Sequence, residues 1–253
     1  MLGIARESHT NLPYIPSSTI RGRLRASVSD PTTRVQLFGP DLKDLDNRQF
    51  LDDYELATEK KLTQLEQGNI WVGDASLLWV PVPSLSHGVV WVSCPILLER
   101  WARFNSSIAE IPLVYSTNLA TNGSLIYLKD AILPTNHLQN WEKWQSFVPQ
   151  TSQTSAIKRV LVLPAQHCAT LIQMSLWRQV KVKLDAHKSV DGGFRYEEAI
   201  PPDTLMYFCW GTTSQANGTA EQSRRDFQQI LTNHEILQIG GKDSGQGLDK
   251  IKF

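Results

Sequence analysis

The chain has 253 residues, and its 25 basic and 25 acidic side chains give a formal net charge of zero. A hydrophobic fraction of 41% and eight tryptophans exclude a mostly disordered protein and indicate a folded one with a sizeable core. Because the net charge is zero, nucleic-acid binding does not follow from overall charge, and any basic surface must be local.

Three further features of the sequence argue against a disulfide-bonded, a metal-binding and a membrane-spanning protein. Cys94, Cys168 and Cys209 form no CxxC pair, which is typical of buried thiols in a reducing compartment rather than of a disulfide framework or a zinc site. The six histidines are dispersed, so their spacing predicts no metal cluster. The sequence has no long uncharged apolar run and no signal-peptide core, so we expect a cytoplasmic protein without a membrane span.

The stretch 12–27 (LPYIPSSTIRGRLRAS) predicts a helix that follows an extended, proline-bounded approach. Pro16 keeps the approach extended, and Ser18 and the serine before it offer side-chain oxygens to cap the helix. Ile20 and Leu24 lie four residues apart and form an apolar stripe along it.

Two arginines on the same predicted helix suggest a phosphate site. Arg21 and Arg25 are four residues apart, so they share one face. A helix N-terminus beside two guanidinium groups suits a phosphate. An amphipathic helix with a solvated arginine face explains the same pattern, and the stretch alone favours this simpler interpretation.

The next hundred residues predict a sheet with a helix. Residues 31–67 are rich in charged and amide side chains and indicate a mainly solvated insertion. Residues 75–82 and 88–93 are apolar runs separated by prolines and a glycine, which predicts two strands. Pro95 suits the first turn of a helix. A strand, turn, strand and helix in succession favour an α+β sheet with helices on one face.

The remaining chain alternates between irregular and strand-like patterns. Residues 105–158 predict loops and insertions packed on the core, and residues 159–163 predict a strand. Apolar and polar residues alternate in 180–185, and an Asp-Gly-Gly turn precedes a return at 194–199, which together predict a β-hairpin. A strand at 205–210 and an amphipathic helix near Phe227 follow.

A glycine-rich run lies near the end of the chain. Four glycines occur within residues 240–247, and such a run frees backbone N–H groups to face phosphates, with Gly240, Gly241 and Lys242 as candidates. A turn before a last short strand explains the run equally well. No Ser or Thr follows Lys242, so the run is not a Walker P-loop, and the chain also lacks HExxH, GxSxG and GxGxxG motifs.

Four stretches, taken in order, resemble one family. Residues 9–25 resemble the RAMP motif, in which a Pro-Gly/Ser-Ser-Ser segment leads into a helix bearing a basic residue and a glycine. Residues 74–104 resemble the sheet-and-helix signature of the repeated backbone subunit of the type III-B CRISPR effector, the Cmr complex. Residues 196–207 and 239–248 resemble later motifs of that subunit, the second being its C-terminal glycine-rich loop.

The resemblance implies a fold and a set of partners. The fold is α+β, a modified ferredoxin-like or RRM-like RAMP palm with an antiparallel sheet, formed by residues 1–253 as a single domain. Large insertions are expected near 31–67 and 105–158, and a β-hairpin thumb near 180–199. The implied partners are guide RNA, target RNA, further copies of the chain and other effector subunits, with no membrane.

The resemblance also assigns roles to residues. Guide phosphates would be held without reading sequence, which base pairing does instead, by Ser18, Arg21, Arg25, Gly240, Gly241 and Lys242. Family members cut target RNA at regular intervals through a metal-dependent attack of the ribose 2′-OH. A divalent cation such as Mg²⁺ is therefore the implied cofactor, and His9 and Glu197 are the catalytic candidates.

The sequence departs from the family at its start. Family members open with a β-strand and carry a catalytic aspartate just before the segment that matches residues 6–10, but no acidic residue precedes Arg6 here. We therefore expect the first strand to be missing and target cleavage to be weak or absent. Three functions stay open: a sequence-independent RNA-binding scaffold, a nuclease subunit of the same assembly, and a stand-alone RAMP endoribonuclease that processes precursor guide RNA.

Overall fold

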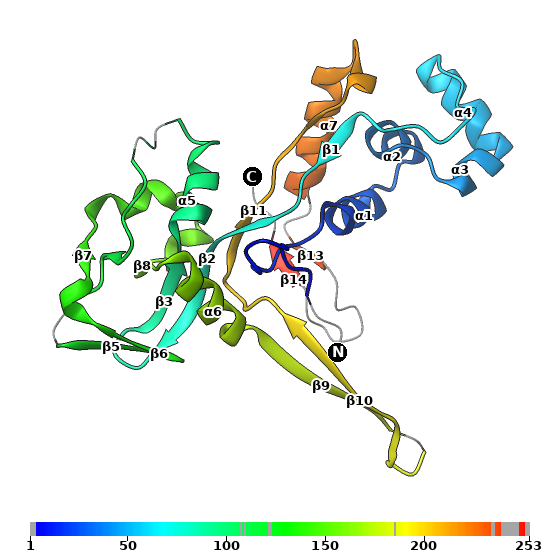
Figure 1. Ribbon diagram of the computed structural model, residues 1–253. Helices are drawn as coiled ribbons and strands as arrows, with labels where there is room; N and C mark the ends of the chain where they lie inside the picture. Colours follow the sequence, from blue (N-terminus) through cyan, green and yellow to red (C-terminus); the bar gives the residue numbers. More distant parts are fainter. Residues whose placement is uncertain are drawn as a thin grey trace. The chain divides into compact units, whose positions relative to one another are not determined.

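The structure is a computed structural model that describes residues 4–106, 108, 110–120, 123–184, 186–233, 236–238 and 248–250. The chain forms two compact units, each built from two segments. The first unit comprises Met1–Tyr14 and Ser76–Tyr207, and the second comprises Ile15–Ala75 and Phe208–Phe253. Figure 1 labels the elements of both units. The single domain expected over residues 1–253 stays a prediction.

A mixed sheet forms the centre of the first unit. Its strand order is β6-β5-β2-β3-β8-β4-β7, and β11 pairs with β2. The strands are β2 (Ser76–Ser84), β3 (Gly88–Ser93), β4 (Ser116–Thr117), β5 (Leu125–Leu128), β6 (Ala131–Pro134), β7 (Gln139–Asn140), β8 (Val160–Val162) and β11 (Leu205–Tyr207). The strands predicted at 75–82, 88–93 and 159–163 are therefore confirmed.

The pairing within this sheet corrects the expectation of an antiparallel sheet. β2 pairs antiparallel with β3, β5 and β11, but β3 pairs parallel with β8, and β4 pairs parallel with β7. The connection from β3 to β8 contains the helix α5 (Pro95–Ala102). A connection of that length can return the chain to the same end of the sheet, which a tight turn cannot do.

Apolar side chains cover both faces of the central strands. Val80 and Val92 face a cluster that is completed by the helix α6 (Ala165–Ser175). Trp79 and Val160 belong to a second cluster, which includes residues of the 3-10 helix η2 (Glu142–Phe147). Strands buried on both faces need near-continuous apolar sequences, which explains the composition of β2 and β3. Two further 3-10 helices, η1 (Thr135–His137) and η3 (Thr154–Ala156), lie in the predicted insertion 105–158.

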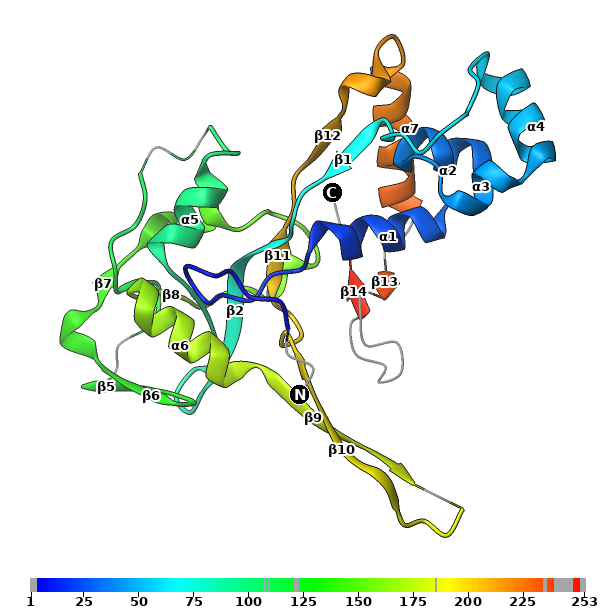
Figure 2. The ribbon, with the colours of Figure 1, turned by 45° about the vertical axis from the view of Figure 1, so that its right-hand side comes forward.

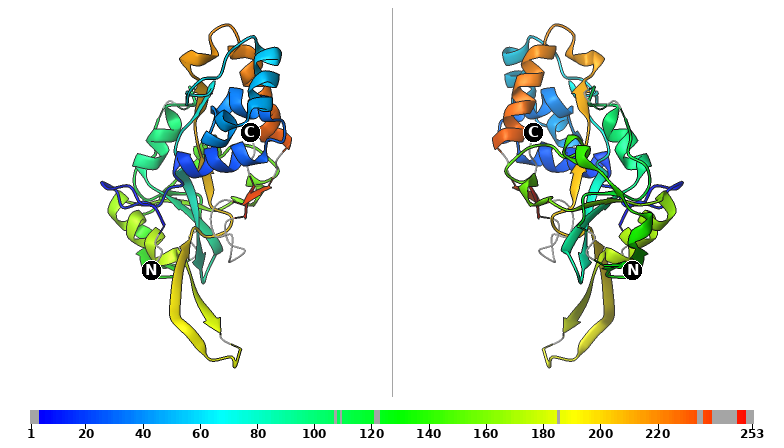
Figure 3. Two further views of the ribbon diagram at one scale, coloured as in Figure 1. Left: turned by 90° about the vertical axis from the view of Figure 1, so that its right-hand side faces the viewer. Right: turned by 90° about the vertical axis from the view of Figure 1, so that its left-hand side faces the viewer.

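A long hairpin extends from the first unit. β9 (Trp177–Leu184) pairs antiparallel with β10 (Val190–Ala199), and the register shifts between Val190 and Phe194. Figure 1, Figure 2 and both views of Figure 3 show the hairpin standing away from the sheet and helices of its unit. The hairpin predicted at 180–199 is confirmed, and it starts three residues earlier than the alternation begins.

The second unit is mainly helical. Its helices are α1 (Ser17–Ser27), α2 (Pro31–Phe38), α3 (Leu42–Asp46), α4 (Arg48–Thr58), the 3-10 helix η4 (Ser214–Ala216) and α7 (Ala220–Asn233). Two strand pairs complete it, β1 (Ile70–Val72) with β12 (Trp210–Thr212) and β13 (Ile236–Gln238) with β14 (Leu248–Lys250). The Phe227 ring of α7 packs against Phe38 and Trp210, at centroid distances of 6.0 and 4.8 Å.

The segment 31–67 contains three helices, although its composition indicated a mainly solvated insertion. These helices are capped by polar residues whose type suggested a solvated segment. The Asp30 side chain accepts a hydrogen bond from the Thr33 amide, Asp41 and Asp44 form a capping box, and the Asn47 side chain accepts from the Phe50 amide. The apolar residues between them bury a small cluster that contains Val35, Tyr54 and Leu62.

Two further expectations concern strands. The single strand predicted at 205–210 is divided, because β11 pairs with β2 and β12 pairs with β1. Residues 4–14 form no strand, and within them Arg6 makes an isolated bridge to Pro13. The expected lack of the family's opening strand stays a prediction. No helix within the described part of the chain is long and apolar enough to cross a membrane.

Candidate functional site

The candidate site lies in the first unit, where residues 4–14, called here the N-terminal loop, fold back on themselves. The Glu7 amide donates to the Leu12 carbonyl at 2.9 Å, and the Asn11 amide donates to the Glu7 carbonyl at 2.8 Å. Asn11 adopts a φ of 58°, a left-handed conformation that asparagine tolerates well. Leu12 is buried in the core, so the loop is anchored while its polar side chains stay near the surface.

Glu7 and Arg100 form the first ionic contact of this loop. The two Nη atoms of Arg100, on α5, donate to the two Glu7 carboxylate oxygens at 2.6 and 3.1 Å, and the Thr10 hydroxyl donates to the same carboxylate at 2.5 Å. Burial alone would raise the pKa of Glu7, but the hydrogen bonds from Arg100 and Thr10 outweigh it and hold the pKa below its usual value. The carboxylate therefore stays charged and ties the loop to α5.

His9 contacts the same guanidinium. An Nη atom of Arg100 lies 3.2 Å from the His9 Nε2. A guanidinium can only donate, so Nε2 is the acceptor in this contact. The same nitrogen lies 3.8 Å from a Glu7 carboxylate oxygen. The His9 side chain is 69% exposed, which leaves the rest of the ring open to solvent.

A second ionic contact joins the N-terminal loop to the foot of the hairpin. The side chain of Glu198, on β10, is almost fully buried. One of its carboxylate oxygens lies 2.9 Å from an Arg6 Nη atom, and the other lies 3.4 Å from the Arg178 Nε. Arg178 lies directly opposite Glu198 in the register of β9 and β10. Two guanidinium groups share one carboxylate, so this cluster has a net positive charge beside the loop.

The structure places the two predicted catalytic residues on different elements of the first unit. His9 lies beside Arg100 and Glu7, whereas Glu197 lies opposite Gln179 on the hairpin. Adjacent residues of a strand point to opposite faces, and the carboxylate of Glu198, the residue after Glu197, contacts Arg6 of the N-terminal loop. Sequence reasoning missed Glu198, Arg178 and Arg100. The hairpin register could have paired the first two, but no local pattern identifies the third.

Arg21 and Arg25 lie in the second unit and make internal contacts. Arg21 donates to the Phe38 carbonyl and Arg25 to the Gly39 carbonyl, so both satisfy groups at the C-terminal end of α2. Arg25 also contacts Asp44 at 2.9 Å and Asp41 at 3.2 Å. Burial and the neighbouring Arg25 charge lower the pKa of Arg21.

The N-terminus of α1, predicted as a phosphate seat, holds a carboxylate of the chain itself. The Ser17 amide donates to the Asp74 Oδ1 at 2.6 Å, while the N-cap residue, Pro16, makes no side-chain cap. Ser18 is exposed, and Gly22 is exposed with open space beside it. Gly240, Gly241 and Lys242 lie outside the described residues.

The described residues do not fit a resident divalent cation. Among them, no three His, Cys, Asp or Glu side chains gather as a metal site would require. The two carboxylates of the candidate site, Glu7 and Glu198, are both paired with arginines. Their charge is offset within the protein, which does not suit a cation that needs several oxygen ligands.

The hairpin adds an exposed apolar surface and an open hollow at its foot. Phe194 lies opposite Val182 and Tyr196 opposite Val180, and these four side chains, called here the hairpin stripe, are between 39% and 63% exposed. At the hairpin foot, an open hollow of about 590 Å³ is lined by Lys129, Met174, Leu176, Trp177 and Arg178.

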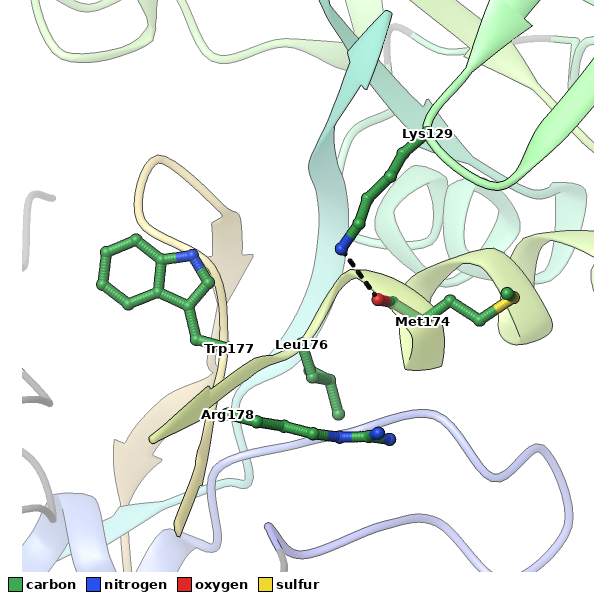
Figure 4. A pocket seen from close by; sticks show the side chains of 5 residues that line it. All are labelled: Lys129, Met174, Leu176, Trp177 and Arg178. Carbon is green, nitrogen blue, oxygen red and sulfur yellow. Dashed lines mark hydrogen bonds between the residues drawn. The ribbon is translucent and has the colours of Figure 1, made fainter. Parts of the chain in front are cut away.

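Figure 4 shows how the side chains around this hollow are held. The Lys129 ammonium donates to the Met174 carbonyl at the end of α6, at 3.2 Å. The Trp177 ring and the Arg178 side chain point to different sides of β9 (Figure 4). The foot of the hairpin thus presents two cations and a half-exposed indole.

Comparisons with known proteins give one consistent result. The family model described as the RAMP superfamily matches residues 1–248. The "CRISPR system Cmr endoribonuclease Cmr4" of Pyrococcus furiosus is 28% identical over 278 residues, which cover 98% of this chain and 86% of that protein.

Solved structures share the fold. The crystal structure of oligomeric Cmr4 from Pyrococcus furiosus matches with a TM-score of 0.69 and 24% identity, covering 98% of this chain and 89% of that one. A chain in the cryo-EM structure of the type III-B Cmr-beta complex bound to cognate target RNA matches with a TM-score of 0.70 and 19% identity, covering 98% and 86%. The expected RAMP fold is confirmed, and the chain belongs to the RAMP superfamily.

Proposed function

We propose that this protein is a guide-RNA-binding backbone subunit of a type III-B CRISPR effector in antiviral defence. Copies of the chain assemble with other subunits along a guide RNA in the cytoplasm and present that guide to target RNA. The observation that carries this proposal is the end-to-end alignment with Cmr4, which covers 98% of the chain. A structural neighbour described as oligomeric and another bound to target RNA support the same partners.

In this proposal the β9–β10 hairpin is the thumb that contacts the guide–target duplex. The hairpin stripe offers Phe194 and Tyr196, whose rings are 63% and 46% exposed. Aromatic side chains stack on any base, so they suit a protein that leaves sequence reading to base pairing. The cations at the hairpin foot, Lys129 and Arg178, are placed to contact phosphates beside the stacked bases.

The residues assigned to the guide RNA divide into two groups. Ser18 is exposed and Arg21 is half-buried, and we assign direct contacts to both. The same role is proposed for Gly240, Gly241 and Lys242, which lie outside the described residues. Arg25 is committed to Gly39 and two aspartates. Its contribution to guide binding is therefore to hold α1 and α2 in the shape that the guide contacts.

The geometry at His9 favours a scaffold over an efficient nuclease. A general base must have a free lone pair near the ribose 2′-OH, but the His9 Nε2 accepts from Arg100. Arg100 itself suits a phosphate, because a guanidinium offsets the charge that develops on a phosphoryl group. We therefore propose that this loop binds target RNA and cleaves it weakly, and that any Mg²⁺ dependence reflects ions brought by the RNA.

Assembly on guide RNAs of increasing length tests the proposal. The chain is mixed with guides of three lengths, and the complexes are measured by analytical ultracentrifugation. We expect the number of copies per guide to rise in proportion to guide length. A single copy on every guide would instead indicate the stand-alone endoribonuclease, and robust cutting of guide-paired target at regular intervals would overturn the scaffold assignment.

A further inference from the structure

Two buried cysteines lie together in the core of the first unit. Cys94 and Cys168 are 1% and 0% exposed and belong to the same apolar cluster. Each thiol shifts the pKa of the other, as two neighbouring sulfurs do, and both are free thiols in the structure. The proposed RNA-binding role uses neither residue. Two neighbouring thiols can be oxidised to a disulfide, whereas a single buried thiol cannot.

The fold itself brings the two cysteines together. β3 and β8 are parallel neighbours with Ser93 opposite Val162, and the Leu163 amide donates to the Ser93 carbonyl at 2.8 Å. Cys94 directly follows β3 at the N-cap of α5, and Cys168 lies in the first turns of α6 after β8. Neighbouring parallel strands end at the same edge of the sheet, so the helices that follow them start side by side.

The surroundings of Cys94 favour its thiolate. The neighbouring Cys168 thiol, the backbone amides at the start of α5 and the Arg100 charge together outweigh burial and lower the pKa of Cys94 to about 7. The proximity of Cys94 and full burial raise the pKa of Cys168. Cys94 is therefore the more acidic thiol of the pair.

We propose that Cys94 and Cys168 form a redox site that a small peroxide converts to an intramolecular disulfide between the starts of α5 and α6. The Cys94 thiolate attacks one peroxide oxygen and breaks the O–O bond, giving a sulfenic acid and hydroxide. The Cys168 sulfur then attacks the Cys94 sulfur, the S–O bond breaks, and the oxygen and the Cys168 proton leave as water. Two thiols are oxidised by two electrons, and the peroxide is reduced.

The site connects to the N-terminal loop through one residue. Arg100 lies on the helix that begins after Cys94. Its pKa is raised chiefly by the hydrogen bond and charge of Glu7, and to a smaller extent by Tyr207 and Cys94. A disulfide removes the smallest of these contributions, so oxidation is expected to have a small effect on the contacts of Arg100 with Glu7 and His9.

Intact-mass and peptide analysis of the folded full-length chain tests the proposal. The protein is treated with hydrogen peroxide, remaining thiols are blocked, and peptides are mapped without reduction. We expect a loss of two hydrogens and a cross-linked peptide pair that contains Cys94 and Cys168, both reversed by dithiothreitol. Cys209 serves as the internal control, because it is a half-buried thiol with no cysteine partner among the described residues.

Two variants distinguish a specific Cys94–Cys168 disulfide from unselective oxidation of thiols. Cys168→Ser should abolish the cross-link and leave Cys94 as a sulfenic or more oxidised acid, whereas Cys209→Ser should leave the cross-link unchanged. The proposal is overturned if peroxide oxidises Cys209 in the wild-type protein while Cys94 and Cys168 stay reduced. It is equally overturned if the cross-link appears only in urea-unfolded protein.

Discussion

Arg100 binds Glu7 through both carboxylate oxygens, at 2.6 and 3.1 Å, and so joins α5 to a loop 93 residues earlier in the chain. Glu198 makes the corresponding contact from the hairpin, at 2.9 Å from Arg6. Two consecutive loop residues, one basic and one acidic, are thus each held by an opposite charge from a different element. The position of His9 depends on both contacts.

Glu7→Gln should loosen the N-terminal loop. The amide cannot replace the paired charge, and loss of a half-buried hydrogen bond to a charged group costs about 1–3 kcal/mol. Hydrogen exchange is the direct measurement, and the amides of Glu7 itself, Asn11 and Tyr14, which close the loop, should exchange faster. The matched control is Glu55→Gln, because Glu55 pairs with Lys61 at 3.6 Å on the exposed surface and should change little. Equal effects of the two substitutions would contradict the anchoring role.

The same carboxylate predicts a pH dependence. The pKa of Glu7 is lower in the folded protein than its usual value of 4.5, because hydrogen bonds from Arg100 and Thr10 outweigh the effect of burial. A lowered pKa gives stability that is fully present above pH 4.5 and is lost as the pH falls through the folded value. The difference in the free energy of unfolding between wild type and Glu7→Gln should therefore shrink below pH 4.5. A difference that stays constant down to pH 3 would show that the charge is not involved.

Local patterns in the sequence predicted a large part of the first unit. The hairpin of β9 and β10 follows from alternation and an Asp-Gly-Gly turn, and β2, β3 and α5 follow from apolar runs and Pro95. The parallel ladder of β3 with β8 did not follow, because it depends on where a connection of more than sixty residues returns. The helix content of residues 31–67 was underestimated, because the polar residues that cap these helices were interpreted as a sign of a solvated segment.

The candidate site was harder to predict than the fold. His9 was identified, but its partner Arg100 lies 91 residues away in the sequence. Glu198 lies 192 residues from Arg6, the loop residue that it contacts. Charge pairs at such separations leave no periodic signal. Arg21 and Arg25 share a face of the helix, as predicted. Only the structure shows that both donate hydrogen bonds to carbonyl groups at the end of α2.

The hairpin stripe should contribute to RNA affinity without contributing to folding. Phe194→Ser combined with Tyr196→Ser should weaken binding of a guide–target duplex by about 1–3 kcal/mol for each ring that stacks on a base. Fluorescence anisotropy at one fixed salt concentration measures the loss. Leu85→Ser is the control, since Leu85 is 91% exposed in the same unit but lies on the turn between β2 and β3. Unchanged affinity of the double variant would rule out the stripe as the duplex contact.

Replacing Arg21 and Arg25 with Ala should weaken retention of all guide RNAs roughly equally. Contacts to the RNA backbone carry no sequence information, so three unrelated guides should lose affinity by the same factor. Asp44→Asn is the matched control, because it weakens the internal contacts of Arg25 and Arg34 without removing a basic group. If Asp44→Asn reduces retention as much as the double variant does, the arginines act only through the fold. A loss confined to one guide would count against any backbone-holding role.

Gly22→Ala should make the protein more stable and yet bind guide RNA less well. Gly22 is inside α1, where alanine is favoured over glycine by about 0.5–1 kcal/mol, and no atom lies within 4 Å of the position that a Cβ would take. The added methyl group therefore has room in the free protein, but it covers the bare backbone next to Arg21. Thermal unfolding and guide retention are measured on the same preparation, with Gly123→Ala as a second glycine whose Cβ would also meet no neighbour. Higher stability with unchanged retention would show that the guide does not approach this face of α1.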